Sequence, residues 1–245
     1  MSAAPFIRCR SLEKGFGQKP VLRGVSLDVL SGESLVLLGG SGSGKSVLLK
    51  HMNGLLRPDR GAVEVDGTPL APLDEEGLIP VRRKVSMLFQ QGALFDSLTV
   101  GENVAYPLRE HHLAPDEDIP ARVREALALV DLPGTEPLMP AELSGGMRKR
   151  AALARALVLE PRALLYDEPT TGLDPVTAAR INHLIRDVQR RLGLTSVVVT
   201  HDLASAFLVA DRIAFLHDGR IRFTGSPEEA RASPDPPLHE FLNAA

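Results

Sequence analysis

The chain has 245 residues, a formal net charge of −3 and 44% hydrophobic residues, values typical of a soluble globular protein with one large α/β domain or two small lobes. The near-neutral charge argues against a general nucleic-acid binder, which needs a strongly basic face. Cys9 is the only cysteine, so an intrachain disulfide is excluded and a reducing compartment is expected. We find neither a signal-peptide core nor an apolar run near the roughly 20 residues that span a bilayer. The sequence therefore predicts a cytoplasmic protein that reaches a membrane only through a partner.

Strand and helix signals alternate along the chain. Apolar runs bounded by turn residues predict strands at 7–12, 21–29, 34–38, 85–89, 163–166 and 196–200, and hairpins at 62–70 and 212–224. Apolar residues at helical spacing predict helices at 119–130, 147–159 and 175–192, and another after Lys45 that Pro58 and Gly61 are expected to end. The strand-helix-strand order from 163 to 200 implies a right-handed crossover and a parallel sheet.

The stretch GGSGSGKS has the glycine, lysine and serine spacing of a phosphate-binding loop, with an apolar strand before it and an apolar helix after it. Small residues let backbone N–H groups converge on phosphate oxygens, and the positive end of the following helix points to the same place. Lys45 can reach the β- and γ-phosphates, and the Ser46 hydroxyl can ligate Mg²⁺. The nucleotide-binding residues expected here are Gly39, Gly40, Ser41, Gly42, Ser43, Gly44, Lys45 and Ser46.

Two carboxylates follow the apolar strand 163–166. Asp167 ends the strand, where it is suited to hold Mg²⁺ through water, and Glu168 comes next, where it can polarise an attacking water. Two neighbouring carboxylates alone are typical of a solvated strand end. We interpret Asp167 and Glu168 as site residues because the phosphate-binding loop at 39–46 is also present. Together these motifs predict that the chain binds ATP with Mg²⁺.

The motif LSGGM at 143–147, followed by a helix and then by the strand that ends in Asp-Glu, resembles the ATP-binding cassette (ABC) family. The resemblance covers nearly the whole chain. It implies catalytic roles for Lys45, Gln90, Glu168 and His201. It implies metal contacts from Ser46, Gln90 and Asp167.

Two further residues gain a role from the resemblance. Phe16 stands where the family places an aromatic ring against the adenine, and Asp174 in TTGLDP matches the family's aspartate loop. Without the resemblance, a lone phenylalanine is more often a core residue.

The residues of the LSGGM stretch also predict an anion-binding helix N-terminus. Ser144 can cap a helix whose first turn holds Gly145 and Gly146, and the free N–H groups and positive dipole of that helix end form a second anion site. One triphosphate does not need both this anion site and the phosphate-binding loop from the same chain. The resemblance implies a head-to-tail homodimer in which residues 39–46 of one copy and 144–146 of the other enclose each ATP. Met147, where the family most often has glutamine, lies beside these contacts.

More specific likenesses are found at 87–111, 143–157 and 234–244, which resemble the MlaF-type ATPases of Mla/Mce lipid-transport systems. This resemblance implies an ATPase that energises phospholipid transport by a separate membrane permease with an Mce-type lipid-binding subunit. The chain would then lie on the cytoplasmic face of the inner or plasma membrane. A short permease helix would dock in a groove beside Gln90, with apolar contacts from Phe89, Leu94, Phe95 and Leu98.

Other interpretations stay open. Each of these four apolar residues would serve equally well in the core. The ATPase could drive another permease, for amino acids, metals or lipoproteins. A soluble cassette acting on ribosomes or DNA predicts a second cassette or a long insertion, and we find neither. A cassette that only binds nucleotide is disfavoured because Glu168 and His201 are both present.

The expected fold is an α/β P-loop nucleotide triphosphatase of the ABC ATPase kind. It has a RecA-like parallel-sheet core, an N-terminal antiparallel β subdomain and a helical subdomain that carries LSGGM. We expect a single domain over 6–242, divided into a core at 6–95 and 160–225, a helical subdomain at 96–159 and a C-terminal helical tail at 226–245.

Overall fold

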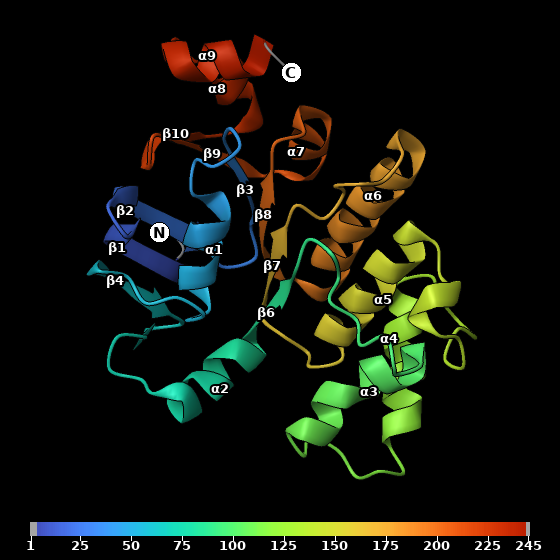
Figure 1. The fold of residues 1–245 in the computed structure, drawn as a ribbon. Helices are drawn as coiled ribbons and strands as arrows, with labels where there is room; N and C mark the ends of the chain where they lie inside the picture. The colour runs from blue at the N-terminus through green and yellow to red at the C-terminus, as the bar shows by residue number, and fades with distance from the viewer. Residues whose placement is uncertain (1–3, 244–245) are drawn as a thin grey trace.

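Two β-sheets organise residues 4–243, the part of the chain described by this computed structural model (Figure 1). The antiparallel sheet has the order β2-β1-β4-β5 and comprises β1 (Pro5–Phe16), β2 (Lys19–Leu30), β4 (Arg60–Val65) and β5 (Thr68–Pro69). The second sheet has the order β10-β9-β3-β8-β7-β6 and comprises β3 (Ser34–Leu38), β6 (Val85–Leu88), β7 (Ala163–Asp167), β8 (Thr195–Thr200), β9 (Arg212–His217) and β10 (Arg220–Gly225). Its strands are parallel except β10, which confirms the predicted parallel sheet.

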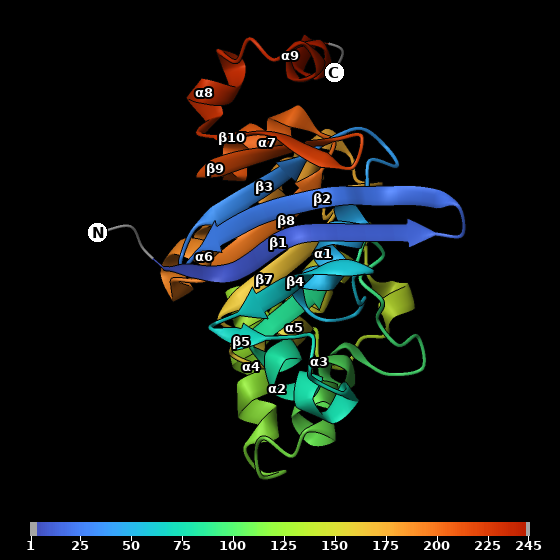
Figure 2. The ribbon, with the colours of Figure 1, turned by 90° about the vertical axis from the view of Figure 1, so that its left-hand side faces the viewer.

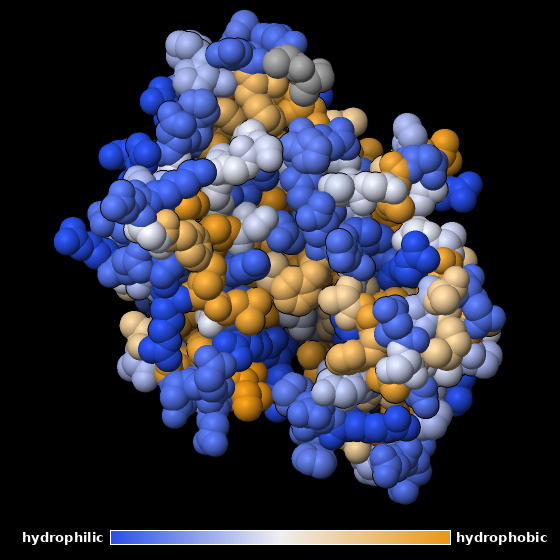
Figure 3. Space-filling model, viewed as in Figure 1, coloured by the Kyte–Doolittle hydropathy of each residue, from blue (hydrophilic) through white to orange (hydrophobic). Residues whose placement is uncertain are grey.

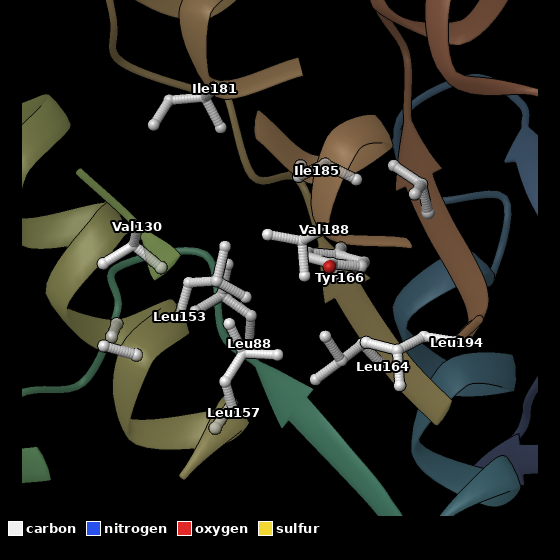
Figure 4. Packing of buried hydrophobic residues seen from close by; sticks show 14 of the residues in the cluster. Leu88, Val130, Leu153, Leu157, Leu164, Tyr166, Ile181, Ile185, Val188 and Leu194 are labelled. Carbon is white, nitrogen blue, oxygen red and sulfur yellow. The ribbon is translucent and has the colours of Figure 1, made fainter. Parts of the chain in front are cut away.

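The central strands separate two hydrophobic cores. On β3, Leu35 and Leu37 face the core shared with the antiparallel sheet, whereas Val36 and Leu38 face the core under the helices. Every residue of β3, β7 and β8 is buried, so these strands are nearly continuous apolar runs without alternation. Figure 2 shows the long β1-β2 hairpin lying across this sheet, and Figure 4 shows the packing in the second core.

The helices divide between the two cores. Buried residues of α1 (Lys45–Met52) and α2 (Glu75–Lys84) join the core between the sheets. The second core is covered by α3 (Val100–Glu110), α4 (Ile119–Leu129), α5 (Gly145–Leu157), α6 (Pro175–Leu192) and α7 (Leu203–Val209), with contributions from α8 (Pro227–Arg231) and α9 (Pro236–Asn243). In Figure 1, α3, α4 and α5 form a lobe at the side of the sheet, and α8 and α9 lie at the opposite end of the molecule. No helix within 4–243 is long and apolar enough to cross a membrane.

Most predicted elements are found within a few residues of their expected bounds, but the helix after Lys45 is shorter than predicted. It ends at Met52, well before Pro58 and Gly61. The reason is Gly54, which has a φ of 71° and turns the chain out of the helix. Leu55 is therefore 40% exposed although its spacing is helical. Helix α2, which holds the basic run 82–84, was not predicted.

The parallel register brings several chain segments to one edge of the sheet. Leu38 at the end of β3 pairs with Thr200 at the end of β8, and Asp167 at the end of β7 pairs with Val199. The residues that follow these strands therefore meet at the carboxyl edge, where parallel α/β sheets bind ligands.

His51 on α1 should make the stability of the fold depend on pH. Its ring is 1% exposed, and Nδ1 donates to the Val47 carbonyl at 2.6 Å. Burial lowers the pKa of His51 from its ordinary value of 6.5. Below pH 6.5 the unfolded chain therefore binds more protons at this residue, and the free energy of unfolding should fall as the pH decreases.

Denaturant unfolding at several pH values measures this effect. The variant His51→Asn keeps a donor near the position of Nδ1 and should show a shallower loss of stability below pH 6.5. The control His183→Asn changes an exposed histidine and should keep the wild-type pH dependence. An equal pH dependence in wild type and His51→Asn contradicts the assignment.

Candidate active site

The phosphate loop connects β3 to α1, and its backbone packs closely against neighbouring strands at two of its glycines. A Cβ on Gly39 would lie 2.4 Å from the Leu216 carbonyl oxygen. Gly44 precedes α1 with a φ of 105°, and a Cβ there would lie 3.0 Å from side-chain atoms of Val21 and Leu22. The tight packing against β2 and β9 thus fixes the loop at the start of α1, where helix N–H groups favour anions.

Lys45 lies folded into this loop. Its ammonium donates hydrogen bonds to the carbonyls of Gly39 at 2.8 Å and Gly40 at 3.0 Å, and the residue is only 7% exposed. Burial lowers the pKa of Lys45, and the carboxylates of Glu168 and Asp167 oppose this shift. A cation held here by carbonyls alone is well placed to exchange them for phosphate oxygens.

Ser46 and Asp167 form the part of the site that suits a metal. The Ser46 hydroxyl donates to Oδ1 of Asp167 at 2.7 Å, and Asp167 is 8% exposed. A hydroxyl and a carboxylate oxygen are hard ligands of the kind that Mg²⁺ prefers, and Mg²⁺ usually takes its remaining ligands from water and phosphate. This donor set fits magnesium. Among residues 4–243 no group of three or more histidine, cysteine or acidic side chains forms a metal cage.

Glu168 is held by three contacts at the end of β7. Nδ1 of His201 donates to its Oε1 at 2.9 Å, and the Thr171 hydroxyl donates to its Oε2 at 3.1 Å. Its backbone N–H donates to the Val199 carbonyl at 2.9 Å, and its φ is 50°. This backbone conformation is uncommon for a residue other than glycine and carries strain. The surrounding contacts therefore fix the direction of the carboxylate.

A single cavity of about 780 Å³ brings most of the predicted site residues together. From the prediction it is lined by Phe16, Gly40, Ser41, Gly42, Gly44, Lys45, Ser46, Gln90, Glu168 and His201. Gly39 and Asp167 contribute from behind it through their bonds to Lys45 and Ser46. Ser43 faces a neighbouring depression instead.

The aromatic ring at the cavity mouth belongs to Phe16. It is 50% exposed at the end of β1, with the ammonium of Lys14 5.7 Å from its centroid. An exposed ring beside a phosphate loop can stack on a planar base. This location is far from the core position that a lone phenylalanine usually takes.

Four residues line the cavity that sequence reasoning missed, namely Val21, Val47, Thr171 and Phe241. Thr171 had a detectable signal, because it is a hydroxyl residue three positions after the acidic pair. Phe241 had none. It comes from α9, and its ring lies 5.3 Å from that of Phe215 in the core.

The remaining predicted residues lie outside this cavity in a patch of their own. Ser144 caps α5 by accepting a hydrogen bond from the Met147 N–H at 3.3 Å, as predicted. A Cβ on Gly146 would lie 2.6 Å from Cγ2 of Thr177, so α5 begins directly against α6. Asp174 caps α6 by accepting from the N–H groups of Val176 and Thr177. Hydrogen bonding by the Thr177 side chain, and then by these backbone groups, lowers the pKa of the Asp174 carboxyl. Within one chain this second helix end is separate from the phosphate loop.

The parallel sheet, the phosphate loop and the carboxylates at the sheet edge together define a P-loop nucleotide triphosphatase. A family model described as "ABC transporter" matches residues 22–171. The chain belongs to the ABC transporter family, and the predicted ABC ATPase fold is confirmed. As a member of this family the protein binds ATP and is an ATPase.

Two curated relatives are similar over nearly the whole chain. The intermembrane phospholipid transport system ATP-binding protein MlaF of Escherichia coli K12 is 40% identical over 99% of this chain and 90% of its own length. The probable ribonucleotide transport ATP-binding protein mkl of Mycobacterium leprae is 44% identical over 97% of this chain and 68% of its own length.

A solved structure reproduces the fold. The dimeric cassette MJ0796 in a post-hydrolysis state with ADP and Pi is 34% identical, with a TM-score of 0.82 over 90% of this chain and 98% of that one.

Thr171 should support hydrolysis by holding Glu168. The variant Thr171→Val keeps the shape of the side chain but removes the hydroxyl that donates to Oε2. We expect kcat to fall roughly tenfold, equivalent to about 1.4 kcal/mol, with little change in KM for ATP. Steady-state phosphate release measures both constants. Thr224→Val, at an exposed position on β10, is the matched control, and an equal kcat in both variants would refute the role of Thr171.

Proposed function

We propose that the protein is the ATP-hydrolysing subunit of a transporter that moves phospholipid through a separate membrane permease. The observation that carries the chemistry is the cavity in which Lys45, Glu168 and His201 converge. The observation that favours phospholipid is the similarity to MlaF along almost the full length of both chains.

The geometry supports distinct roles for the residues in the cavity. Lys45 would neutralise phosphate charge, since its ammonium already lies inside the loop. Glu168 would polarise the attacking water after its carboxylate leaves the His201 ring, and His201 would then be free to contact the γ-phosphate. Gln90 would contact the water and the metal. Phe16 would stack on the adenine.

Mg²⁺ would be held by Ser46 and Asp167, with Gln90 as a further contact. When bound, the ion supplies positive charge that stabilises the phosphoryl transition state. The hydrogen bond between Ser46 and Asp167 supports this assignment because it keeps the two metal-binding oxygens 2.7 Å apart.

The separate helix end at Ser144 supports a head-to-tail homodimer. Residues 144–146 and Asp174 have no nucleotide contact available in their own chain, because the phosphate loop opens into a different cavity. A second copy related by two-fold symmetry would bring them to its ATP and make two equivalent sites from one interface. ATP would then hold the copies together, and hydrolysis would release them.

A groove between α2 and α3 supports docking of a permease helix. It has a volume of about 560 Å³ and is lined by residues including Ile79, Phe89, Phe95 and Tyr106, each 38–43% exposed. The space-filling view shows a hollow in this part of the surface with apolar residues beside it (Figure 3). Of the predicted contacts, Leu94 instead packs against the hydrophobic core and Leu98 is half-buried outside the groove.

The charge of this groove indicates which residues the proposed permease helix should have. Arg82, Arg83, His111 and Arg155 line it, and none of the described residues that line it is acidic. Arg82 is also paired with Glu75 at 2.8 Å, and Lys84, the third residue of the basic run, is paired with Asp66 at 3.0 Å. A permease helix with apolar and acidic residues fits this lining best.

Each segment of the domain has its own part in the proposed function. Residues 6–95 and 160–225 would bind and hydrolyse ATP, and 96–159 would carry LSGGM and one side of the permease groove. Residues 226–243 would form a helical tail, whereas 244 and 245 of the predicted tail lie outside the described residues. Bound to its permease, with an Mce-type lipid-binding subunit, the protein would lie on the cytoplasmic face of the inner or plasma membrane.

A second candidate substrate comes from the relative mkl, whose name refers to ribonucleotide transport. Another ABC permease, for amino acids, metals or lipoproteins, is also compatible with the same ATP site. The ATPase contacts only the permease in the proposed complex, so the bound subunits decide between these substrates.

The role of Glu168 is tested by Glu168→Gln. This variant keeps the shape of the side chain but cannot act as a base, so we expect retained MgATP binding, a stable ATP-bound dimer and a rate of hydrolysis lower by roughly 10²- to 10⁴-fold. Phosphate release and size-exclusion chromatography measure these properties. Glu125→Gln, an exposed position on α4, is the control. Wild-type turnover in Glu168→Gln would exclude the proposed role.

The transport role is tested by purifying the tagged protein from detergent-solubilised membranes and identifying bound subunits and lipids. We expect a permease, an Mce-type subunit and phospholipid. The groove variant Phe95→Asp should lose the permease because it places a charge between apolar contacts, whereas Leu192→Asp, on the exposed end of α6, should retain it. Recovery of a soluble amino-acid-binding subunit, or of bound ribonucleotide in place of lipid, would overturn the phospholipid proposal.

A further inference from the structure

One loop of the chain faces both the ATP cavity and the groove. It leaves β6 after Leu88 and reaches α3 at Val100. Gln90 lines the ATP cavity, whereas Phe89, Ala93 and Phe95 line the groove. Whatever holds this loop therefore sets the position of Gln90.

Two cations on α5 hold the backbone of this loop. The Lys149 ammonium donates a hydrogen bond to the Gln90 carbonyl. The Arg155 guanidinium donates to the carbonyls of Ala93 at 2.8 Å and Gly92 at 2.9 Å. The loop lies directly against the helix, because a Cβ on Gly92 would be 3.3 Å from the Cβ of Ala152.

Lys149 is an unusual residue to find in this position. It is 7% exposed, and its burial lowers its pKa while the charge of Glu168 opposes the shift. Burying a lysine is costly unless its ammonium is hydrogen-bonded, and the Gln90 carbonyl is the bond found here. By contrast, the next residue, Arg150, is half-buried and donates to the carbonyls of Val130 and Asp131 beyond the end of α4.

We propose that Lys149 is a positioning residue that fixes Gln90 in the ATP cavity by holding its carbonyl against α5. The inference rests on the proposed function for the role of Gln90 and for the dimer. Helix α5 begins at Ser144, the end that would meet the ATP of the second copy. A shift of α5 on ATP binding would therefore pull Gln90 through Lys149 and the groove wall through Arg155.

A double-mutant cycle tests the proposal. The variants are Lys149→Met, Gln90→Ala and the double variant, with kcat and KM from phosphate release and affinity for a fluorescent ATP analogue. Lys149→Met should lower kcat roughly 10- to 100-fold, because a small misplacement of a reacting group has this effect, while nucleotide affinity is unchanged. The double variant should be no slower than Gln90→Ala alone, since both changes remove the same contribution.

Matched variants separate positioning from stability. Lys149→Arg keeps a cation that can reach the carbonyl and should recover most of kcat. Lys149→Gln, which keeps a shorter donor, should lie between wild type and Lys149→Met, and it replaces Lys149→Met in the cycle if that variant does not fold. Arg150→Met removes the neighbouring cation and its two carbonyl bonds and should keep the wild-type kcat.

The proposal would be overturned by wild-type kcat in Lys149→Met, by losses that multiply in the double variant, or by an equal loss of kcat in Arg150→Met. A Gln90→Ala protein with wild-type kcat would also overturn it, since Lys149 would then have nothing to position. Failure of the proposed function has a different signature, because Glu168→Gln would then hydrolyse ATP at the wild-type rate.

Discussion

The parallel register of β3, β7 and β8 is the constraint on which the rest of the structure depends. These strands are buried on both faces, so sliding one of them by a residue would exchange apolar contacts between two cores at once. The register brings the strand ends to one edge, where Ser46 meets Asp167 and Glu168 meets His201. The packing of two cores thus fixes distances between residues that are far apart in the sequence.

The candidate site residues at the carboxyl edge of the sheet are held by two different parts of the fold. The hydrogen bonds of Lys45 and Ser46 join the start of α1 to the loop after β3 and to the end of β7. Gln90 belongs instead to a loop whose backbone is held from α5, in the helical lobe. The candidate site therefore combines residues at the sheet edge, which we propose as phosphate and metal ligands, with one residue whose loop is held from the helical lobe.

Much of the fold could be predicted from the sequence because its signals are local. Buried strands are visible as apolar runs. The glycine, lysine and serine spacing of Gly39–Ser46 indicates a phosphate-binding loop before α1, and Ser144 before two glycines indicates the start of α5. A predicted helix end was wrong where one residue mattered more than the helical spacing of apolar residues, as Gly54 does after the end of α1. Lys149 and Phe241 could not be assigned functions because their proposed roles come from contacts between distant segments, and a lysine or phenylalanine at those positions has no distinctive pattern.

Phe241 has a practical consequence for work on this protein. Its ring packs on Phe215 and also lines the cavity proposed for ATP, so α9 would form part of the wall around a nucleotide bound there. An affinity tag or fluorescent fusion placed after α9 would be attached next to this wall and could alter measured nucleotide binding without touching any motif residue.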